Sequence, residues 1–418
     1  MKKREQRQRS ALEELIPDEG KRKEMIGLLY QGAPLLGEGG IFNDLVQSLV
    51  NAALEGEIQG HLDEPEQVLG GNRRNGYTSK SVRSKAGMLE VKTPRDRHGE
   101  HEPKLIKKWE RELNTGLDEV ILSLYAHGQS VEDVRHQIRQ LYGVEMSAGT
   151  ISAVTDKVWS EITAWQQRPL SGCYPVVYLD AIVYKIREDS RVINKAIYTL
   201  YGVNAGGQRE ILGLYLNETE GARQWGLILE DIKRRGVEEV FFFCVDGLNG
   251  FKEVIQEVFP SSIVQRCIVH MIRSSTRFVS DKDLKVICAD LRKVYTSANR
   301  EQARIALTAF GEKWDGKYKE VRQKWEDNWQ ELMAFMDYRE DIRRMIYTTN
   351  PVEALHRVMR KVTKTKGAWT NDKALLKQLY LTLTYNEKSW KRTAFNWKVI
   401  QRELLDQFAE RYSRWLEN

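Results

Sequence analysis

Three acidic residues stand at positions where a folded chain could bring their carboxylates together. Asp180 interrupts the apolar run VVYLDAIVYKI, and Asp246 ends the run VFFFCVD. Both runs are typical of β-strands, whereas Glu353 lies one turn into an amphipathic helical segment. Hard divalent cations such as Mg²⁺ prefer carboxylate and phosphate oxygens, and a bound pair can activate an attacking oxygen and stabilise a leaving one. The three carboxylates therefore point to metal-dependent exchange of phosphodiester bonds.

Each carboxylate alone also has a purely structural interpretation. An isolated Asp in a strand is common, and an acidic residue early in a helix, such as Glu353, is favoured by the helix dipole. The order and the context of all three residues favour the functional interpretation.

Several further segments accompany the acidic residues in a fixed order. They are GNRRNGYTSKSV, VKTPRDRHGEHEPKLI, VVYLDA, CVDGLNGF, QRCIVH and TTNPVEALHRVMRKVTKTKGAW. As an ordered set they resemble the bacterial insertion-sequence transposases of the Mutator-like class, whose catalytic domain has a ribonuclease-H-like fold with an Asp-Asp-Glu triad. The resemblance implies a DNA transposase that binds the ends of its element and catalyses metal-dependent cleavage and strand transfer.

The resemblance also implies how the acidic residues act. Asp180 is assigned as the bridging metal ligand, with Asp246 and Glu353 as flanking ligands. Mg²⁺ is the expected cofactor, and Mn²⁺ can substitute for it. Water would first attack at the element's end, and the freed 3′-hydroxyl would then attack another phosphodiester.

Cys267 and His270, in QRCIVHMIR, match a Cys-x-x-His signature of this transposase class. The pair could be half of a zinc site completed by His98 and His101, but structural zinc sites usually show two recognisable pairs rich in thiolates. We expect the pair to support the active site, with His270 acting as a catalytic residue near the scissile phosphate.

Basic residues suited to DNA phosphates occur in two places. Arg357 and Lys361 come four and eight residues after Glu353, hence on roughly its helix face. A charged run of this kind can equally be a solvated helix face. The expected DNA-binding residues are Arg73, Arg74, Arg95 and Arg97 on basic loops, and Arg357, Arg360, Lys361 and Lys364 on the helix.

The composition agrees with a DNA-associated protein. The 418 residues carry a formal net charge of +6, which makes the chain modestly basic. Four cysteines in a chain of this length do not form a disulfide framework, and the longest apolar runs are of strand length. We expect no signal peptide and no membrane span, and a location in the bacterial cytoplasm, at the nucleoid when DNA is bound.

A helical pair is expected before the first catalytic strand. Ser130 gives a capping signal, Gly143 ends that helix, and Ser147 begins a second helix whose apolar positions continue to Ile162. This is the outline of a helix-turn-helix, although an ordinary helical hairpin gives the same pattern. The resemblance favours a DNA-end-binding module.

The remaining pattern predicts a sheet with an insertion. Three antiparallel strands precede alternating helix and strand, with SIVQRCIVH as the fifth strand. This is the order of the ribonuclease-H-like sheet, and the resemblance implies that Asp180 and Asp246 lie on adjacent central strands. Glu353 comes 107 positions after Asp246, so a helical segment is inserted between them. Its tryptophans are expected to fill the helical core rather than stack on an unpaired base.

The predicted fold class is therefore α+β or α/β, with a ribonuclease-H-like mixed sheet, a helical insertion and a mainly helical N-terminal DNA-binding region. The predicted domains are 1–70, a charged tail and amphipathic helices that begin near Met25; 71–169, the DNA-binding region with its helix-turn-helix-like segment at about 113–167; 171–271 with 346–400, the catalytic domain; 272–345, the helical insertion; and 401–418, a C-terminal helix.

The expected partners are double-stranded DNA, both terminal inverted repeats and target, and further copies of the chain in a homodimer or higher multimer. Two alternatives differ in function class. One is a ribonuclease-H-like DNA nuclease without strand transfer, and the other is a domesticated DNA-binding remnant. The N-terminal modules disfavour the first alternative, and the intact triad disfavours the second.

Overall fold

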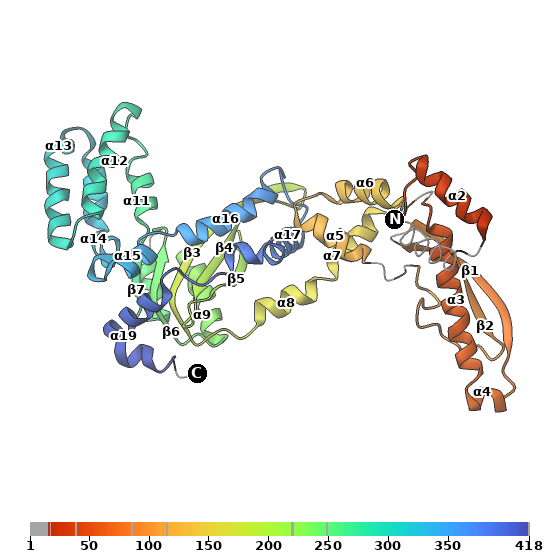
Figure 1. Ribbon diagram of the computed structural model, residues 1–418. Helices are drawn as coiled ribbons and strands as arrows, with labels where there is room; N and C mark the ends of the chain where they lie inside the picture. The colour runs from red at the N-terminus through yellow and green to blue at the C-terminus, as the bar shows by residue number, and fades with distance from the viewer. Residues whose placement is uncertain are drawn as a thin grey trace, which may run out of the picture. The chain divides into compact units, whose positions relative to one another are not determined.

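The structure is a computed structural model that describes residues 16, 18–37, 40–84, 87–111, 113, 116–218, 221–247 and 250–416. Contacts divide the chain into two compact units, Met1–Lys157 and Val158–Asn418, whose elements are labelled in Figure 1. The division falls inside the region expected to bind DNA, 71–169, so the last helix of that region belongs to the second unit.

The first unit packs helices against a two-stranded sheet. Val50, Leu54 and Ile58 on one face of α3 are buried, as its amphipathic spacing predicts. The first described helix begins at Glu19 rather than near Met25, and the charged tail before it lies outside the described residues, Ile16 and Asp18 excepted. The elements are α2 (Glu19–Tyr30), α3 (Asn43–Leu62), α4 (Pro65–Leu69), β1 (Arg74–Ser84), β2 (Gly87–Asp96), α5 (Leu117–Ala126), α6 (Val131–Tyr142) and α7 (Ala148–Asp156).

The Gly- and Arg-rich segment forms an antiparallel hairpin of β1 and β2, with Val82 opposite Leu89. The expectation that its arginines lie on loops is wrong for Arg74 and Arg95, which belong to the strands. The polar first half of β1 is exposed along its length, so it lacks the alternating apolar residues that mark a strand in sequence.

Helices α5, α6 and α7 share one hydrophobic cluster. Ser130 and Asp133 form the expected capping box of α6, Gly143 ends that helix in the left-handed conformation at φ 63°, and Ser147 caps α7. The expected continuous second helix is wrong, because α7 ends at Asp156 and a separate helix, α8 (Trp159–Gln167), follows.

The second unit is built on a five-stranded mixed sheet, ordered β5-β4-β3-β6-β7. The strands β3 to β5 pair antiparallel, whereas β6 runs parallel to both β3 and β7, as the sequence predicts. The fifth strand is shorter than expected because Cys267 already caps the next helix. The strands are β3 (Cys173–Glu188), β4 (Arg191–Val203), β5 (Arg209–Asn217), β6 (Glu239–Val245) and β7 (Ile263–Arg266).

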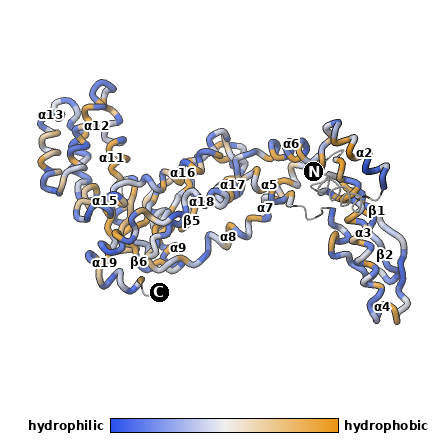
Figure 2. The backbone as a smooth tube through the Cα atoms, viewed as in Figure 1, coloured by the Kyte–Doolittle hydropathy of each residue, from blue (hydrophilic) through white to orange (hydrophobic). Residues whose placement is uncertain are grey.

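Helices cover both faces of this sheet and close two hydrophobic cores. One core contains α9 (Ala222–Arg234) and α10 (Phe251–Val258) with alternate residues of β3 such as Val177 and Leu179. The other contains α16 (Asn350–Thr363), α17 (Asp372–Tyr385) and α19 (Trp397–Ser413) with the intervening residues Tyr178 and Ile182. In Figure 2 the hydrophobic colouring is concentrated in the sheet around β6.

All described secondary-structure elements of the expected insertion, 272–345, are helices. Trp325 and Trp329 are buried, as expected for core-filling side chains. The C-terminal helix α19 packs Phe408 and Tyr412 on Phe241 of β6. The remaining elements are α11 (Ile268–Ser275), α12 (Asp281–Tyr295), α13 (Arg300–Asp327), α14 (Trp329–Leu332), the 3₁₀ helix η1 (Ala334–Asp337), α15 (Glu340–Ile346) and α18 (Glu387–Trp390). None of the described helices has the length and apolar character needed to cross a membrane.

Candidate active site

Asp180 lies on β3, and Asp246 directly follows the neighbouring parallel strand β6. The β3–β6 pairing places Leu179 opposite Val245, and each aspartate is the next residue of its chain. Side chains alternate between the faces of a strand. Asp180 therefore shares the face of Tyr178 and Ile182, which is covered by α16. The register therefore places Asp180 and Asp246 at neighbouring positions of adjacent strands, as the sequence predicts.

Asp180 is held by a histidine that the sequence analysis did not single out. Nδ1 of His356 lies 3.1 Å from Oδ2 of Asp180, and His356 is 1% exposed. The backbone N–H of Ala181 donates to Oδ1 of Asp180 at 2.9 Å. Nε2 of His356 is buried and has no hydrogen-bond partner among the described residues. The one buried polar contact that His356 makes is therefore directed at Asp180.

Glu353 lies on the same helix, three residues before His356. Its Oε1 is 3.1 Å from Nε2 of His270 and 3.2 Å from Nη1 of Arg273, both on α11. The helix α16 thus places two functional groups one turn apart, one directed at β3 and the other at α11. The sequence suggested Glu353 and expected His270 in the active site, but it gave no indication of Arg273.

Cys267 and His270 link the start of α11 to the start of α16. The backbone N–H of Thr349 donates to Sγ of Cys267 at 3.3 Å, and the Thr349 hydroxyl lies 3.3 Å from Nδ1 of His270. The hydrogen bond with Cys267 raises the pKa of His270 to about 9 against the lowering effect of burial, and the charges of Asp180 and Asp246 add to the rise. Burial raises the pKa of Cys267, but hydrogen bonds from His270 and Thr349 bring that pKa below its ordinary value. The charges of Asp180 and Asp246 therefore favour the protonated form of His270, and this imidazolium contacts Glu353.

The carboxylates expected to hold a metal offer the oxygen donors that Mg²⁺ prefers, but they do not surround one point. The described part of the chain contains no set of three His, Cys, Asp or Glu residues arranged to hold a metal ion. The carboxylates of Asp180 and Glu353 are instead occupied by the contacts with His356, His270 and Arg273. The zinc alternative, in which His98 and His101 would complete a site with Cys267 and His270, joins residues of different units and stays untested.

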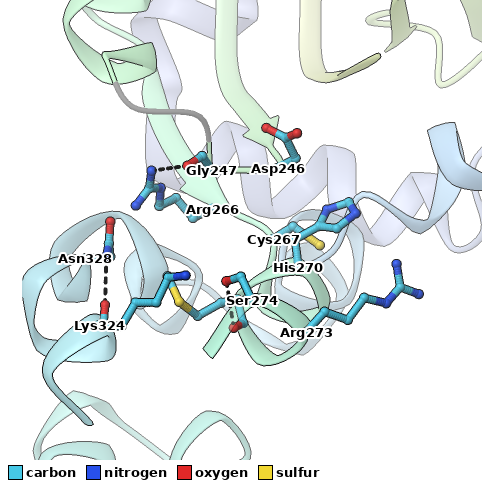
Figure 3. A pocket seen from close by; sticks show the side chains of 10 residues that line it. Asp246, Gly247, Arg266, Cys267, His270, Arg273, Ser274, Lys324 and Asn328 are labelled. Carbon is cyan, nitrogen blue, oxygen red and sulfur yellow. Dashed lines mark hydrogen bonds between the residues drawn. The ribbon is translucent and has the colours of Figure 1, made fainter. Parts of the chain in front are cut away.

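A cavity of about 590 Å³ opens beside these groups (Figure 3). It is bounded by the ends of β6 and β7, by α11, and by α13 of the insertion. Its walls carry several charged side chains, unlike those of a site for an apolar ligand. Basic side chains outnumber acidic ones among them. The lining residues are Asp246, Gly247, Arg266, Cys267, His270, Met271, Arg273, Ser274, Lys324 and Asn328.

The basic residues expected to follow Glu353 lie on the solvent side of α16. The opposite face of the helix is buried through Val352, Leu355 and Met359. The exposed basic residues are Arg357, Arg360, Lys361 and Lys364. They are accessible to a DNA backbone, and their contacts with DNA stay a prediction.

The arginines expected to bind DNA in the first unit gather at the open end of the hairpin. Arg74 pairs opposite Asp96, and the backbone N–H of Arg97 donates to the carbonyl of Arg73 at 2.8 Å. Arg73, Arg95 and Arg97 are exposed, whereas Nη1 of Arg74 forms an ion pair with Oε2 of Glu55 at 2.5 Å.

Asp96 organises the chain around these arginines. Its carboxylate accepts hydrogen bonds from the Asn72 side-chain amide at 2.8 Å and from the backbone N–H groups of Glu100 at 3.1 Å and His101 at 3.2 Å. Burial alone would raise the pKa of Asp96, but these hydrogen bonds lower it to about 2. Asp96 therefore fixes the turn after β2 as an ionised carboxylate.

Replacing Asp96 by Asn is expected to lower the free energy of unfolding of the first unit by about 2 kcal/mol at neutral pH. Because the folded pKa lies below the ordinary value of 3.8, the ionised group stabilises the fold above about pH 4, and this effect is lost as the pH falls toward about 2. Urea unfolding of both proteins at successive pH values should show the difference shrinking over that range. The exposed Asp44→Asn serves as control, and a pH-independent difference would contradict this assignment.

Comparisons of this chain with known proteins find transposases. The model of a family described as "Transposase, Mutator family" matches residues 23–393. The transposase for insertion sequence element ISRM3 of Rhizobium meliloti is 40% identical over 396 residues, covering 93% of this chain and 98% of that protein. A probable transposase for an insertion sequence element of Corynebacterium diphtheriae is 41% identical over 312 residues, covering 74% of this chain and 90% of that protein. A solved structure, the Drosophila P element transposase strand transfer complex, matches 70% of this chain and 85% of that chain at 11% identity and a TM-score of 0.29, which is too weak a likeness to define the fold.

Proposed function

Because this chain belongs to the Mutator family of transposases, we propose that it binds the ends of its insertion element and cleaves and joins DNA with Asp180, Asp246 and Glu353 as a catalytic triad. The observation that carries the proposal is geometric: the β3–β6 register sets Asp180 and Asp246 at neighbouring positions, and Glu353 lies 3.1 Å from His270, which lines the same cavity as Asp246. The mixed sheet that presents the aspartates supports a ribonuclease-H-like catalytic domain.

The three carboxylates would hold Mg²⁺ or Mn²⁺, because hard cations prefer such oxygens. When bound, the metal supplies activation of the attacking oxygen and stabilisation of the leaving oxygen. Glu353 would have to exchange its contacts with His270 and Arg273 for the metal. A DNA phosphate competes for the same two cations, so substrate entry would favour this exchange.

The chain's own cations have roles that do not depend on the metal. His270 and Arg273 would contact the scissile phosphate and offset its charge. The buried His356 would keep the Asp180 carboxylate in one orientation. Recognition of the element's ends would fall to the first unit, through helices α6 and α7 and the arginines of the hairpin, since arginine suits phosphate contacts.

Replacing Arg73, Arg95 or Arg97 by Ala is expected to weaken binding to duplex DNA and to reduce the slope of log K against log salt by about 1 for each arginine. The same change at Arg74 should have less effect, because its guanidinium is already paired with Glu55. Fluorescence anisotropy at several salt concentrations measures both quantities. Equal salt slopes for all four variants and the wild type would remove the hairpin from the DNA-binding surface.

The function is tested by incubating the full chain with a labelled duplex from the inverted repeats that flank its gene, target DNA and Mg²⁺. The proposal predicts nicked ends followed by joined products. Cleavage without joining would indicate a nuclease, and binding without cleavage would indicate a DNA-binding remnant. Because two ends must meet for transposition, we also propose that the active form is a homodimer or a higher multimer on DNA.

A further inference from the structure

The cavity beside Asp246 has walls from two parts of the second unit. The catalytic sheet and α11 provide Asp246, Arg266 and Arg273, whereas α13 of the helical insertion provides Lys324. Its volume of about 590 Å³ lies within the range of roughly 300–1,000 Å³ typical of small-ligand sites. The cavity is therefore large enough for about one nucleotide of a DNA strand, between the insertion and the residues of the proposed triad.

The charges of the cavity favour an anion. Arg266 donates a hydrogen bond to the carbonyl of Gly247, and Arg273 contacts Glu353. Nζ of Lys324 has no hydrogen-bond or carboxylate partner among the described residues. Figure 3 shows the Lys324 side chain extending from α13 toward Ser274 of α11. A half-buried ammonium group without a partner, beside two arginines, suits a phosphate.

The lining also limits what is recognised. The described lining residues include no Phe, Tyr or Trp on which a base could stack, the ring of His270 is already in contact with Glu353 and Thr349, and Trp325 and Trp329 of the insertion are buried in its core. This cavity therefore offers no free Phe, Tyr or Trp face for a base. The acidic Asp327 and Glu331 line a neighbouring cavity instead.

We propose that this cavity holds the sugar-phosphate of the nucleotide next to the scissile bond and that Lys324, from the helical insertion, binds its phosphate. The proposal rests on the function proposed above. It gives the insertion a sequence-independent role, which is to fix the strand beside Asp246 and His270.

Lys324→Met tests the proposal, because it keeps the length and packing of the side chain and removes the charge. The expected result is a loss of binding to the element-end duplex of about tenfold, the usual scale of one charge-assisted hydrogen bond. The slope of log K against log salt should fall by about 0.7–0.9, the contribution of one phosphate. Lys324→Arg should keep both values, and Lys319→Met, an exposed lysine of α13 outside the lining, serves as the matched control.

Ser274→Trp gives a second, independent arm, since Ser274 is exposed and a large side chain there would fill the cavity. It should block cleavage while leaving the melting temperature unchanged. Lys324→Met and Lys319→Met that behave alike, or a filled cavity with full cleavage, would overturn the proposal. A wild-type protein that neither cuts nor joins DNA would instead refute the proposed function.

Discussion

Asp180→Asn, Asp246→Asn and Glu353→Gln are each expected to abolish DNA cleavage and joining, by about 10³-fold or more, while binding to the element's end survives. Each change preserves the size of the side chain and removes the negative charge that a divalent cation requires. Gel assays for nicked and joined products measure the loss, and anisotropy measures the binding.

Glu230→Gln is the matched control for the triad variants. Glu230 is an exposed carboxylate on α9, which covers the sheet face opposite to α16, so this change should leave cleavage and joining intact. Near wild-type joining by any one of the three triad variants would remove that residue from the site.

His356→Leu is expected to lower cleavage by about 10- to 100-fold, the usual scale for a residue that orients a metal ligand. Leucine fills the buried position but leaves Oδ2 of Asp180 without the donor that lies 3.1 Å away. His356→Asn should recover much of the activity, because its amide nitrogen can take the place of Nδ1. Cleavage rates at saturating DNA and Mn²⁺ affinity measured by electron paramagnetic resonance report the effect.

A structural role for His356 gives a different pattern. If the histidine only fills the core, Leu and Asn should change the melting temperature and the activity in parallel, and Asn should offer no rescue. DNA affinity should be unaffected by either variant, because His356 is 1% exposed. Full activity of His356→Leu would show that Asp180 needs no such support.

The five-stranded sheet could be predicted from sequence because its signals are local. The apolar runs around Asp180 and Asp246 set strand length, and alternation set the faces. The sequence does not reveal the division between α7 and α8. Val158 and Ile162 continue the helical spacing of apolar residues that starts at Ile151, so the pattern is the same as that of one continuous helix.

Two partners of the site residues, His356 and Arg273, could not be predicted from sequence. His356 lies among buried apolar positions of α16. In the sequence it resembles any other core residue, because its contact with Asp180 depends on the packing of α16 on β3. The contact of Glu353 with Arg273 needs α11 packed beside α16, across 80 positions of chain. The sequence places Arg74 on a loop rather than on a strand, because a polar strand supported by backbone pairing has no apolar period.

The central claim is that Asp180, Asp246 and Glu353 together bind the metal that drives cleavage. The most direct test is Mn²⁺ binding to the wild type and the three charge-removing variants in the presence of the element's end, by electron paramagnetic resonance, with joining assayed in parallel. The account predicts that Mn²⁺ binds the wild-type complex, that each variant loses this binding, and that a chelator stops joining. Equal Mn²⁺ binding by all four proteins, or joining in the presence of the chelator, would contradict it.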